Sequence, residues 1–212
     1  MKFYDNLLWI LLMFSNSILL HASVIDVTGF GARGDGVTDD HAAIQNAVAE
    51  LKKHNGGILY FPVGQYRIGT SGHGALFLDG MILDAQSNVK VVFADGAVLL
   101  MDNLLPDGSG GGHGIVVRGP GSGITLENIH VRWVKKAIGR SHGDAFRFEG
   151  YPSDGKTIAR IIMNNCIGER SPQTGAVFMG CSDVSVNNFS PVDTWADGLH
   201  FNACRRVNVN GV

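Results

Sequence analysis

Cysteine is scarce in this sequence and stands only in its last quarter. The 212 residues contain three cysteines, Cys166, Cys181 and Cys204, and no C-x-x-C pair. Three cysteines are too few for a disulfide framework, and without a C-x-x-C pair a zinc ribbon or a thioredoxin-like redox site has no support. We therefore expect neither a metal ion nor another cofactor.

A strong charge of one sign is also missing. The 17 basic residues nearly balance the 19 acidic residues, and no long run of one sign occurs. A nucleic-acid partner is therefore not indicated. Glycine, by contrast, is abundant at 29 residues but lacks the Gly-X-Y period of collagen. Many glycines in an apolar chain predict many tight turns between short strands.

The first 23 residues resemble a secretory signal peptide. Lys2 precedes apolar stretches at 7–14 and 18–20, and small residues follow at Ala22 and Ser23. A buried helix or a membrane anchor is the alternative, but the apolar run is short for a bilayer span of roughly 20 residues. We expect a signal peptide over 1–23, a single domain over 24–212, and secretion to the periplasm or the cell exterior without later membrane contact.

Only one segment has a clear helical pattern. Within residues 38–55, apolar residues at i, i+3, i+4 and i+7 predict an amphipathic helix with one buried stripe, formed by Ile44, Ala47, Val48 and Leu51. Thr38, Asp39 or Asp40 can cap its start, and the glycine pair 56–57 ends it. No second long helical stripe follows, so alternating βαβ units are excluded. The remaining chain consists of short runs with strand character.

The end of the chain repeats itself every 23 residues. Residues 175–187 align with 198–210 at seven positions, and the same offset carries 161–165 onto 184–188. A period in the twenties, in units made only of short strands, predicts a parallel β-solenoid. Equal positions then stack about 4.8 Å apart, which places Cys181 over Cys204. We interpret this pair as core filling, because stacking alone does not provide disulfide geometry.

A G-x-G-x-x-G stretch at Gly29, Gly31 and Gly34 has the spacing of a dinucleotide-binding loop. In such a site a phosphate lies against the N-terminus of the following helix. Here the sequence DGVTDD, residues 35–40, separates the last glycine from the helix, and its three aspartates would repel a phosphate. We therefore interpret the stretch as structural.

The same residues carry a different resemblance. VTGFGARGDGVTDDHAAIQNAVAE, followed by GGILYFPVGQYRI, is similar to the N-terminal module of the pectate-lyase-like superfamily. That superfamily of right-handed parallel β-helices includes polygalacturonases, rhamnogalacturonases, alginate epimerases and phage tailspikes. The resemblance covers residues 24 to about 69, and the repeats extend it to the end of the chain. It implies an all-β fold, a right-handed parallel β-helix whose N-terminal end is plugged by the α-helix.

Aligning the last repeats by their first strand gathers polar residues on one outer face. If the phenylalanines of these strands point inward, alternation places Arg147 and His200 outward. Asp144 and Asp197 then lie at aligned strand entrances, two rungs and roughly 9.6 Å apart. Inverting glycosidases hold their two carboxyl groups about 6.5–9.5 Å apart. Asp144 and Asp197 are therefore the candidate catalytic residues.

The resemblance adds weight to Asp197. The stretch WADG, 195–198, is similar to the Asn-Thr-Asp-Gly of polygalacturonase-like hydrolases, whose aspartate is catalytic. Arg147 and His200 are candidates for binding an acidic sugar, and His142 for contacting substrate. Trp195 can stack on a sugar ring or pack beside the turn.

Three functions remain open. The first is an inverting, polygalacturonase-like hydrolase of an acidic polysaccharide. The second is a uronate lyase or epimerase, in which Arg147 or His200 removes the C5 proton after the sugar carboxylate is neutralised. The third is a non-catalytic glycan-binding or tailspike-type module. In each case we expect the partner to be a polysaccharide that contains uronate. The sequence does not indicate an oligomeric state.

The resemblance also implies further residues. In those hydrolases an Asp-Asp pair follows one rung later, at about residue 220 in this numbering, and then a Gly-His-Gly. Gly112-His113-Gly114 spells the latter but lies upstream of Asp197, so we interpret it as a loop. The sequence stops in mid-repeat, and we expect a fragment of a longer enzyme that is inactive by itself.

Overall fold

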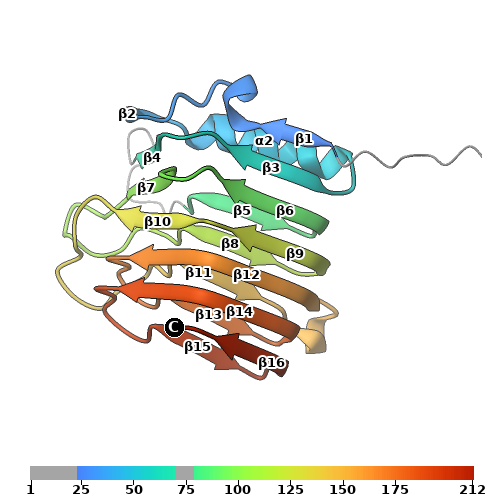
Figure 1. The fold of residues 1–212 in the computed structure, drawn as a ribbon. Helices are drawn as coiled ribbons and strands as arrows, with labels where there is room; N and C mark the ends of the chain where they lie inside the picture. The colour runs from blue at the N-terminus through green and yellow to red at the C-terminus, as the bar shows by residue number, and fades with distance from the viewer. Residues whose placement is uncertain (1–22, 70–78) are drawn as a thin grey trace, which may run out of the picture.

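The structure, a computed structural model, describes residues 23–69 and 79–212. The predicted signal peptide, apart from Ser23, lies outside the described residues. The described chain coils into stacked rungs, with α2 (His41–Lys53) at one end and β15 and β16 at the other (Figure 1). Its helices include none long and apolar enough to cross a bilayer.

One sheet, as far as the chain is described, has five parallel strands in the order β15-β13-β11-β8-β5. Each strand thus pairs with its equivalents one rung earlier and later, which is the arrangement of a parallel β-helix. The strands are β5 (Met81–Asp84), β8 (Ile115–Arg118), β11 (Phe146–Glu149), β13 (Ala176–Met179) and β15 (Leu199–Asn202). Their first residues lie in register across all five rungs.

The second sheet contains eleven strands among the described residues. Its long row is β1 (Val24–Asp26), β3 (Gly57–Phe61), β6 (Ser87–Phe93), β9 (Gly121–Glu127), β12 (Ile158–Glu169), β14 (Cys181–Val192) and β16 (Arg205–Asn210). Its short row is β2 (Asp35–Asp39), β4 (Gln65–Gly69), β7 (Val98–Asp102) and β10 (His130–Trp133). The 23-residue offset is confirmed, because Ile161 pairs with Val184 and Val184 with Val207.

The amphipathic helix is confirmed but shorter than predicted. Residues 35–39 form β2, which pairs with β4, so α2 begins only at His41. All four residues of the predicted stripe are buried, against β1, β3, β5 and the 3₁₀ helix η1 (Val27–Phe30). Two polar side chains of α2 also donate to carbonyl oxygens of the β5 segment, Gln45 to Gly80 at 3.3 Å and Lys52 to Asp84 at 3.2 Å. The helix thereby covers an edge that would otherwise pair with another chain.

The glycine-rich stretch binds a carboxylate of the chain itself. The side chain of buried Asp40 accepts the backbone N–H groups of Arg33 at 2.7 Å and Gly34 at 3.0 Å. The amides that a phosphate would need are therefore occupied, in agreement with the structural interpretation. Because its carboxylate is used in this way, Asp40 sits at the start of α2 without capping it through its side chain.

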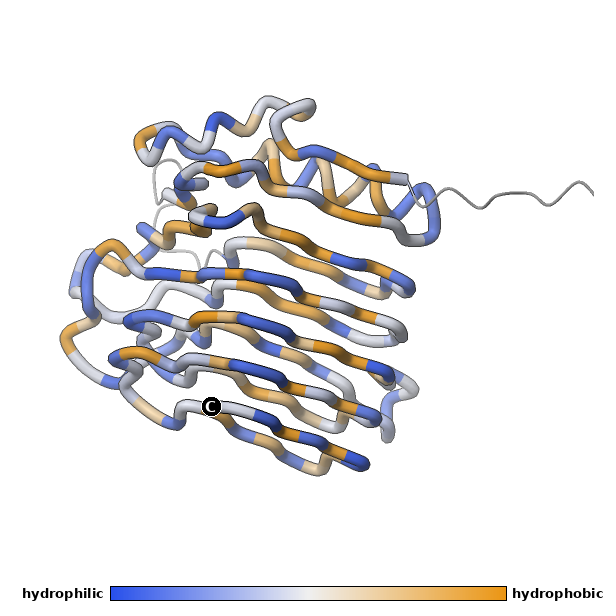
Figure 2. The backbone as a smooth tube through the Cα atoms, viewed as in Figure 1, coloured by the Kyte–Doolittle hydropathy of each residue, from blue (hydrophilic) through white to orange (hydrophobic). Residues whose placement is uncertain are grey.

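The interior of the solenoid is filled by buried apolar side chains, and hydrophobic residues recur along the stacked strands (Figure 2). Phe148, Phe178 and Phe201 stack inward across three rungs, with ring centroids 4.4 and 5.1 Å apart. Their inward orientation confirms the alternation on which the outward placement of Arg147 and His200 depends. A 3₁₀ turn, η2 (Pro152–Asp154), connects β11 to β12.

A ladder of hydrogen-bonded side chains connects neighbouring rungs of the eleven-stranded sheet, and it predicts a modest effect on stability. Asn187 Nδ2 donates to Asn164 Oδ1 at 2.8 Å, and Asn164 Nδ2 donates to Glu127 at 3.1 Å. We expect Asn187→Ala to lower the free energy of unfolding by about 1–2 kcal/mol, because the Asn164 carbonyl loses its donor. Urea unfolding measures this. Asn208→Ala, at an exposed position of β16, serves as the control and should change stability by less than about 0.5 kcal/mol. Equal losses in both variants would rule out a stabilising ladder.

Candidate functional site

A hollow of about 280 Å³ opens on the outer face of the five-stranded sheet. Three consecutive rungs and the loop before β11 contribute its lining, which consists of Arg140, Asp144, Arg147, Gln173, Thr174, Val177, Met179, Asp197 and His200. The register places Arg147, Val177 and His200 side by side, as the repeat alignment predicted. Four of the six predicted site residues therefore share one hollow.

Polar residues occupy the same position, two residues before the strand, in all five rungs of this sheet. They are Asp79, His113, Asp144, Thr174 and Asp197. The first three side chains each accept the backbone N–H of the next residue in the row, at 2.9, 2.9 and 3.0 Å. Side-chain acceptors thus tie successive rungs together along one edge of the hollow, and we call this row the entrance ladder.

Sequence reasoning missed Asp79 and took His113 for a loop residue. Both carry a signal that could have found them, because each member of the entrance ladder is followed by glycine or alanine and then by an apolar residue. The small residue is needed for close packing of the rungs. A Cβ on Gly114, for example, would lie 2.6 Å from the carbonyl oxygen of Ala145.

The entrance ladder also decides whether a metal ion fits nearby. Potential ligand atoms of Asp79, His113 and His142 lie within 4.8 Å of one another. However, His113 Nδ1 accepts the backbone N–H of Asp144, so the neutral ring carries its proton on Nε2 and offers no further lone pair. Asp79 also accepts from Arg118 Nη2 at 2.9 Å. The donor set therefore suits a hydrogen-bonded cluster better than a metal centre.

Asp144 is held as an anion. Its carboxylate is 1% exposed and accepts from Arg147 Nη1 at 2.8 Å and from the Thr174 N–H at 3.0 Å. Burial alone would raise the pKa of Asp144, but its polar contacts, among them the hydrogen bonds from Arg147 and the Thr174 N–H, outweigh burial and lower that pKa below its usual value. Its assignment as a catalytic residue stays a prediction.

The lowered pKa of Asp144 predicts a pH effect on stability. The anion's contribution is complete above the usual pKa of 3.8 and is lost as the pH falls through the lower folded-state pKa. We expect Asp144→Asn to lower the unfolding free energy by about 1–3 kcal/mol at neutral pH. Below about pH 4, the unfolding free energy of this variant should depend less on pH than that of the wild type. Urea unfolding at several pH values measures both. Asp95→Asn, at an exposed site, is the control. If the unfolding free energy of Asp144→Asn fell with acid as steeply as that of the wild type, the lowered pKa of Asp144 would be contradicted.

Asp197 and His200 form a pair on the outermost described rung of the hollow. His200 Nδ1 lies 2.9 Å from Asp197 Oδ2, and the side chains are 45% and 58% exposed. An ionised carboxylate only accepts, so this contact places the ring proton on Nδ1 and leaves a lone pair on Nε2. The pair is thus an imidazole base oriented by a carboxylate.

Arg147 supplies positive charge to the floor of the hollow. Its Nε donates to Glu149 and its Nη1 to Asp144, which fixes the guanidinium plane. Its Nη2 faces the sulfur of Met179 at 3.9 Å, a weak acceptor that an anionic ligand group can replace. Arg140, on the rim, adds a second guanidinium.

The two remaining predicted residues lie outside the lining of the hollow. Trp195 Nε1 donates to the Ala137 carbonyl at 3.0 Å, and Lys136 Nζ stands 5.1 Å from the centre of its ring. Trp195 therefore packs beside the turn, which is one of the two interpretations above. The ring of His142 contacts that of His113 at 4.2 Å between centroids, and burial lowers the pKa of His142.

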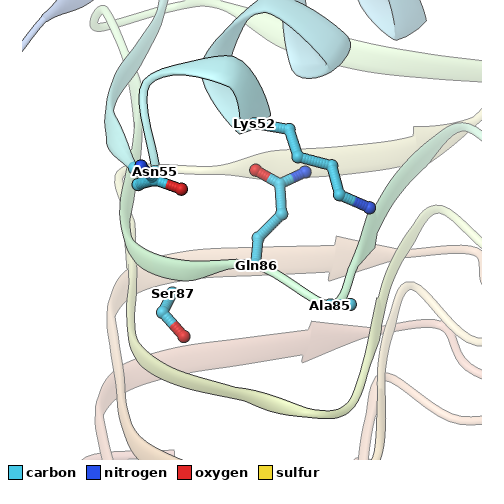
Figure 3. A pocket seen from close by; sticks show the side chains of 6 residues that line it. Lys52, Asn55, Ala85, Gln86 and Ser87 are labelled. Carbon is cyan, nitrogen blue, oxygen red and sulfur yellow. The ribbon is translucent and has the colours of Figure 1, made fainter.

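A second hollow, also of about 280 Å³, lies between the C-terminal end of α2 and the residues that follow β5 (Figure 3). Its lining comprises Lys52, Asn55, Gly56, Ala85, Gln86 and Ser87. It contains no carboxylate or histidine and therefore no acid–base pair. The first hollow is accordingly the candidate site.

Comparison with known proteins agrees with this fold. Residues 24–72 match the family model described as rhamnogalacturonase A/epimerase, pectate lyase-like. The N-terminal part of the chain is thus similar to this pectate-lyase-like family, and the described chain has the parallel β-helix fold. A candidate glycosyl hydrolase from Parabacteroides merdae superposes with a TM-score of 0.57 at 17% identity, covering 88% of this chain and 89% of that one, which shows the shared fold.

Curated proteins similar to part of this chain are named as a mannuronan epimerase and an alginate lyase. Mannuronan C5-epimerase AlgE3 of Azotobacter vinelandii is 41% identical over 73 residues, 32% of this chain. Alginate lyase 7 of the same organism is 42% identical over 69 residues, again 32% of this chain. The chain spans only 4% and 8% of the lengths of these two relatives. Similarity thus supports a carbohydrate-active protein and does not single out a polygalacturonase.

Proposed function

We propose that the protein modifies a uronate-containing polysaccharide by removing the proton at C5 of a uronate residue. This step is common to epimerisation and to lyase-type β-elimination. The observation that carries the proposal is the Asp197–His200 pair, which lies in one hollow with the guanidinium of Arg147. The named activities of the epimerase and lyase relatives support the same substrate class.

The C5 proton becomes acidic only when the adjacent carboxylate is neutralised. In our proposal Arg147 Nη2 and Arg140 bind this carboxylate and stabilise the negative charge that develops on it as the proton leaves. Asp144 and Glu149 orient Arg147 from behind. Asp144 is in this role a positioning residue, and its anionic state keeps the guanidinium in place.

His200 Nε2 takes the C5 proton, and Asp197 stabilises the imidazolium that results. Return of a proton to the opposite face of C5 yields the epimer. Departure of the sugar oxygen from C4 instead yields an unsaturated end, with the electron pair of the C5–H bond forming the new double bond. Both outcomes share the first transition state, so they share these residues.

An inverting, polygalacturonase-like hydrolase is the second candidate, because Asp144 and Asp197 line the same hollow. That mechanism needs one of the two carboxyls in its protonated form. The contacts of Asp144 favour its anion, so Asp197 would have to be the acid. A hydrolase would release new reducing ends without exchanging hydrogen at C5.

The test is to incubate the full-length protein with polymannuronate and with polygalacturonate in deuterated water. Deuterium at C5, detected by NMR, supports proton removal with epimerisation, and an ultraviolet-absorbing unsaturated end supports proton removal with elimination, whose product has no hydrogen at C5. New reducing ends with neither deuterium at C5 nor ultraviolet absorbance would establish the hydrolase instead. Glycan binding without turnover, unaffected by Asp197→Ala, would indicate a binding module. The proposal includes export of the protein, which its polymeric substrate requires.

A further inference from the structure

The two last cysteines stack on consecutive rungs. Met179 pairs with Asn202 and Ser182 with Arg205, so the turns between these pairs run parallel and place Cys181 against Cys204. Neighbouring strands lie about 4.8 Å apart, within the Cα separation of about 4.4–6.8 Å that a disulfide tolerates. The backbone therefore needs no rearrangement to bring the two residues within bonding range.

The side chains add what stacking alone does not provide. Cys204 Sγ lies 3.3 Å from the carbonyl oxygen of Phe178, so this thiol reaches across to the preceding rung. Cys181 Sγ contacts the Met179 carbonyl at 3.4 Å at the same turn, and the Cys204 thiol is near enough to contribute to the raised pKa of Cys181. Cys166, in contrast, pairs in register with Phe189 and has no cysteine beside it among the described residues.

We propose that Cys181 and Cys204 are a dithiol site that oxidises to an inter-rung disulfide, with a small-molecule disulfide such as oxidised glutathione as the oxidant. In the first step the Cys204 thiolate attacks one glutathione sulfur, forms a mixed disulfide and releases one glutathione thiolate. In the second step the Cys181 thiolate attacks the Cys204 sulfur and releases the second glutathione. Two protein thiols lose two protons and two electrons, and one oxidised glutathione becomes two reduced molecules.

The surroundings of the two sulfurs set the order of these steps. Cys204 is partly exposed, whereas Cys181 is buried. Burial, together with the neighbouring thiol, raises the pKa of Cys181 to about 12. Cys204 is therefore the thiol that meets the oxidant, and closure by Cys181 is the slow step, which accelerates as the pH rises.

The disulfide would link the rung that carries the proposed base, His200, to the rung before it. Cys204 follows β15, which carries His200, and Cys181 follows β13. The bond would join two positions that are 23 residues apart, an offset at which side chains of neighbouring rungs are already hydrogen-bonded elsewhere. It would restrict unfolding of the outermost described rung and hold the Asp197–His200 pair against the hollow.

The test uses the full-length folded protein and oxidised glutathione at mildly alkaline pH. After an acid quench, unfolding and alkylation, mass spectrometry of peptides is expected to show Cys181 linked to Cys204, with Cys166 alkylated. The thermal midpoint of the oxidised protein should rise by several degrees and return after reduction. A glutathione adduct that persists on Cys204 while Cys181 stays free would overturn the proposal, and so would failure of both thiols to react.

Three serine variants control the assignment. Cys166→Ser should form the disulfide as the wild type does. Cys181→Ser should stop at the mixed disulfide on Cys204, and Cys204→Ser should leave both remaining thiols reduced. Because the readout on the wild-type protein decides the proposal by itself, a variant that fails to fold does not affect the conclusion. The outcome is also independent of the polysaccharide activity, since no substrate is present.

Discussion

Replacing His200 with asparagine is expected to slow C5 hydrogen exchange by about 10²–10⁴-fold, the usual contribution of a positioned acid–base group. Asparagine keeps a polar side chain beside Asp197 but cannot accept the C5 proton. The measurement is deuterium incorporation into polymannuronate under saturating substrate. Because His200 is 45% exposed, we expect the loss in rate without a comparable loss in stability.

Asn202→Ala is the matched control for His200. Asn202 follows two residues later on the same strand and also points outward, but it lies outside the lining of the hollow. It should retain the exchange rate. Wild-type exchange in the His200 variant would remove His200 as the base while leaving the fold and the substrate class intact.

Phe178→Ala is expected to cost about 3–5 kcal/mol of unfolding free energy, the range for truncating a buried phenylalanine. Phe178 is fully buried and sits between Phe148 and Phe201 in the inward stack. Its removal leaves a cavity shared by three rungs, and these rungs also carry Arg147 and His200. Urea unfolding measures the loss, and substrate binding should weaken in parallel.

Ile162→Ala is the control for this effect. Ile162 belongs to β12 but is 41% exposed, so its truncation should change the unfolding free energy by less than about 0.5 kcal/mol. Similar losses in the two variants would mean that position on the inner or outer face does not determine stability, which a solenoid core would contradict.

The architecture was accessible from the sequence because a solenoid repeats its local rules. Strand residues alternate between the two faces of a sheet, so a phenylalanine that recurs at the same strand position of successive rungs predicts the outward neighbours beside it. Arg147 and His200 were found in this way, two rungs apart. The helix stripe was equally accessible, whereas the helix start was not, because residues 35–39 pair with β4 as a strand and therefore do not join the helix.

The entrance ladder escaped a search at constant spacing for a simple reason. Its members are bonded across separations of 34, 31 and 30 residues in the earlier rungs. Loop insertions change the length of each rung but not the stacking of its strands. Asp79 therefore lies beside His113 in space, and His113 beside Asp144, although no fixed offset in the sequence relates them.

The sequence by itself determined the parallel β-helix, its capping helix and the outer face on which Arg147 and His200 stand. The stacked strands, the apolar stripe of the helix and the outer face follow from local periodicity, and the position of the helix as a cap follows from the resemblance to the pectate-lyase-like superfamily. Only the tertiary structure decided the chemical states of the groups. The burial of Asp144 beside two donors, the engagement of Trp195 with the Ala137 carbonyl and the proximity of Cys181 to Cys204 all involve partners brought together by stacking. Such contacts depend on the lengths of the intervening loops, and the local periodicity of the sequence does not indicate these contacts.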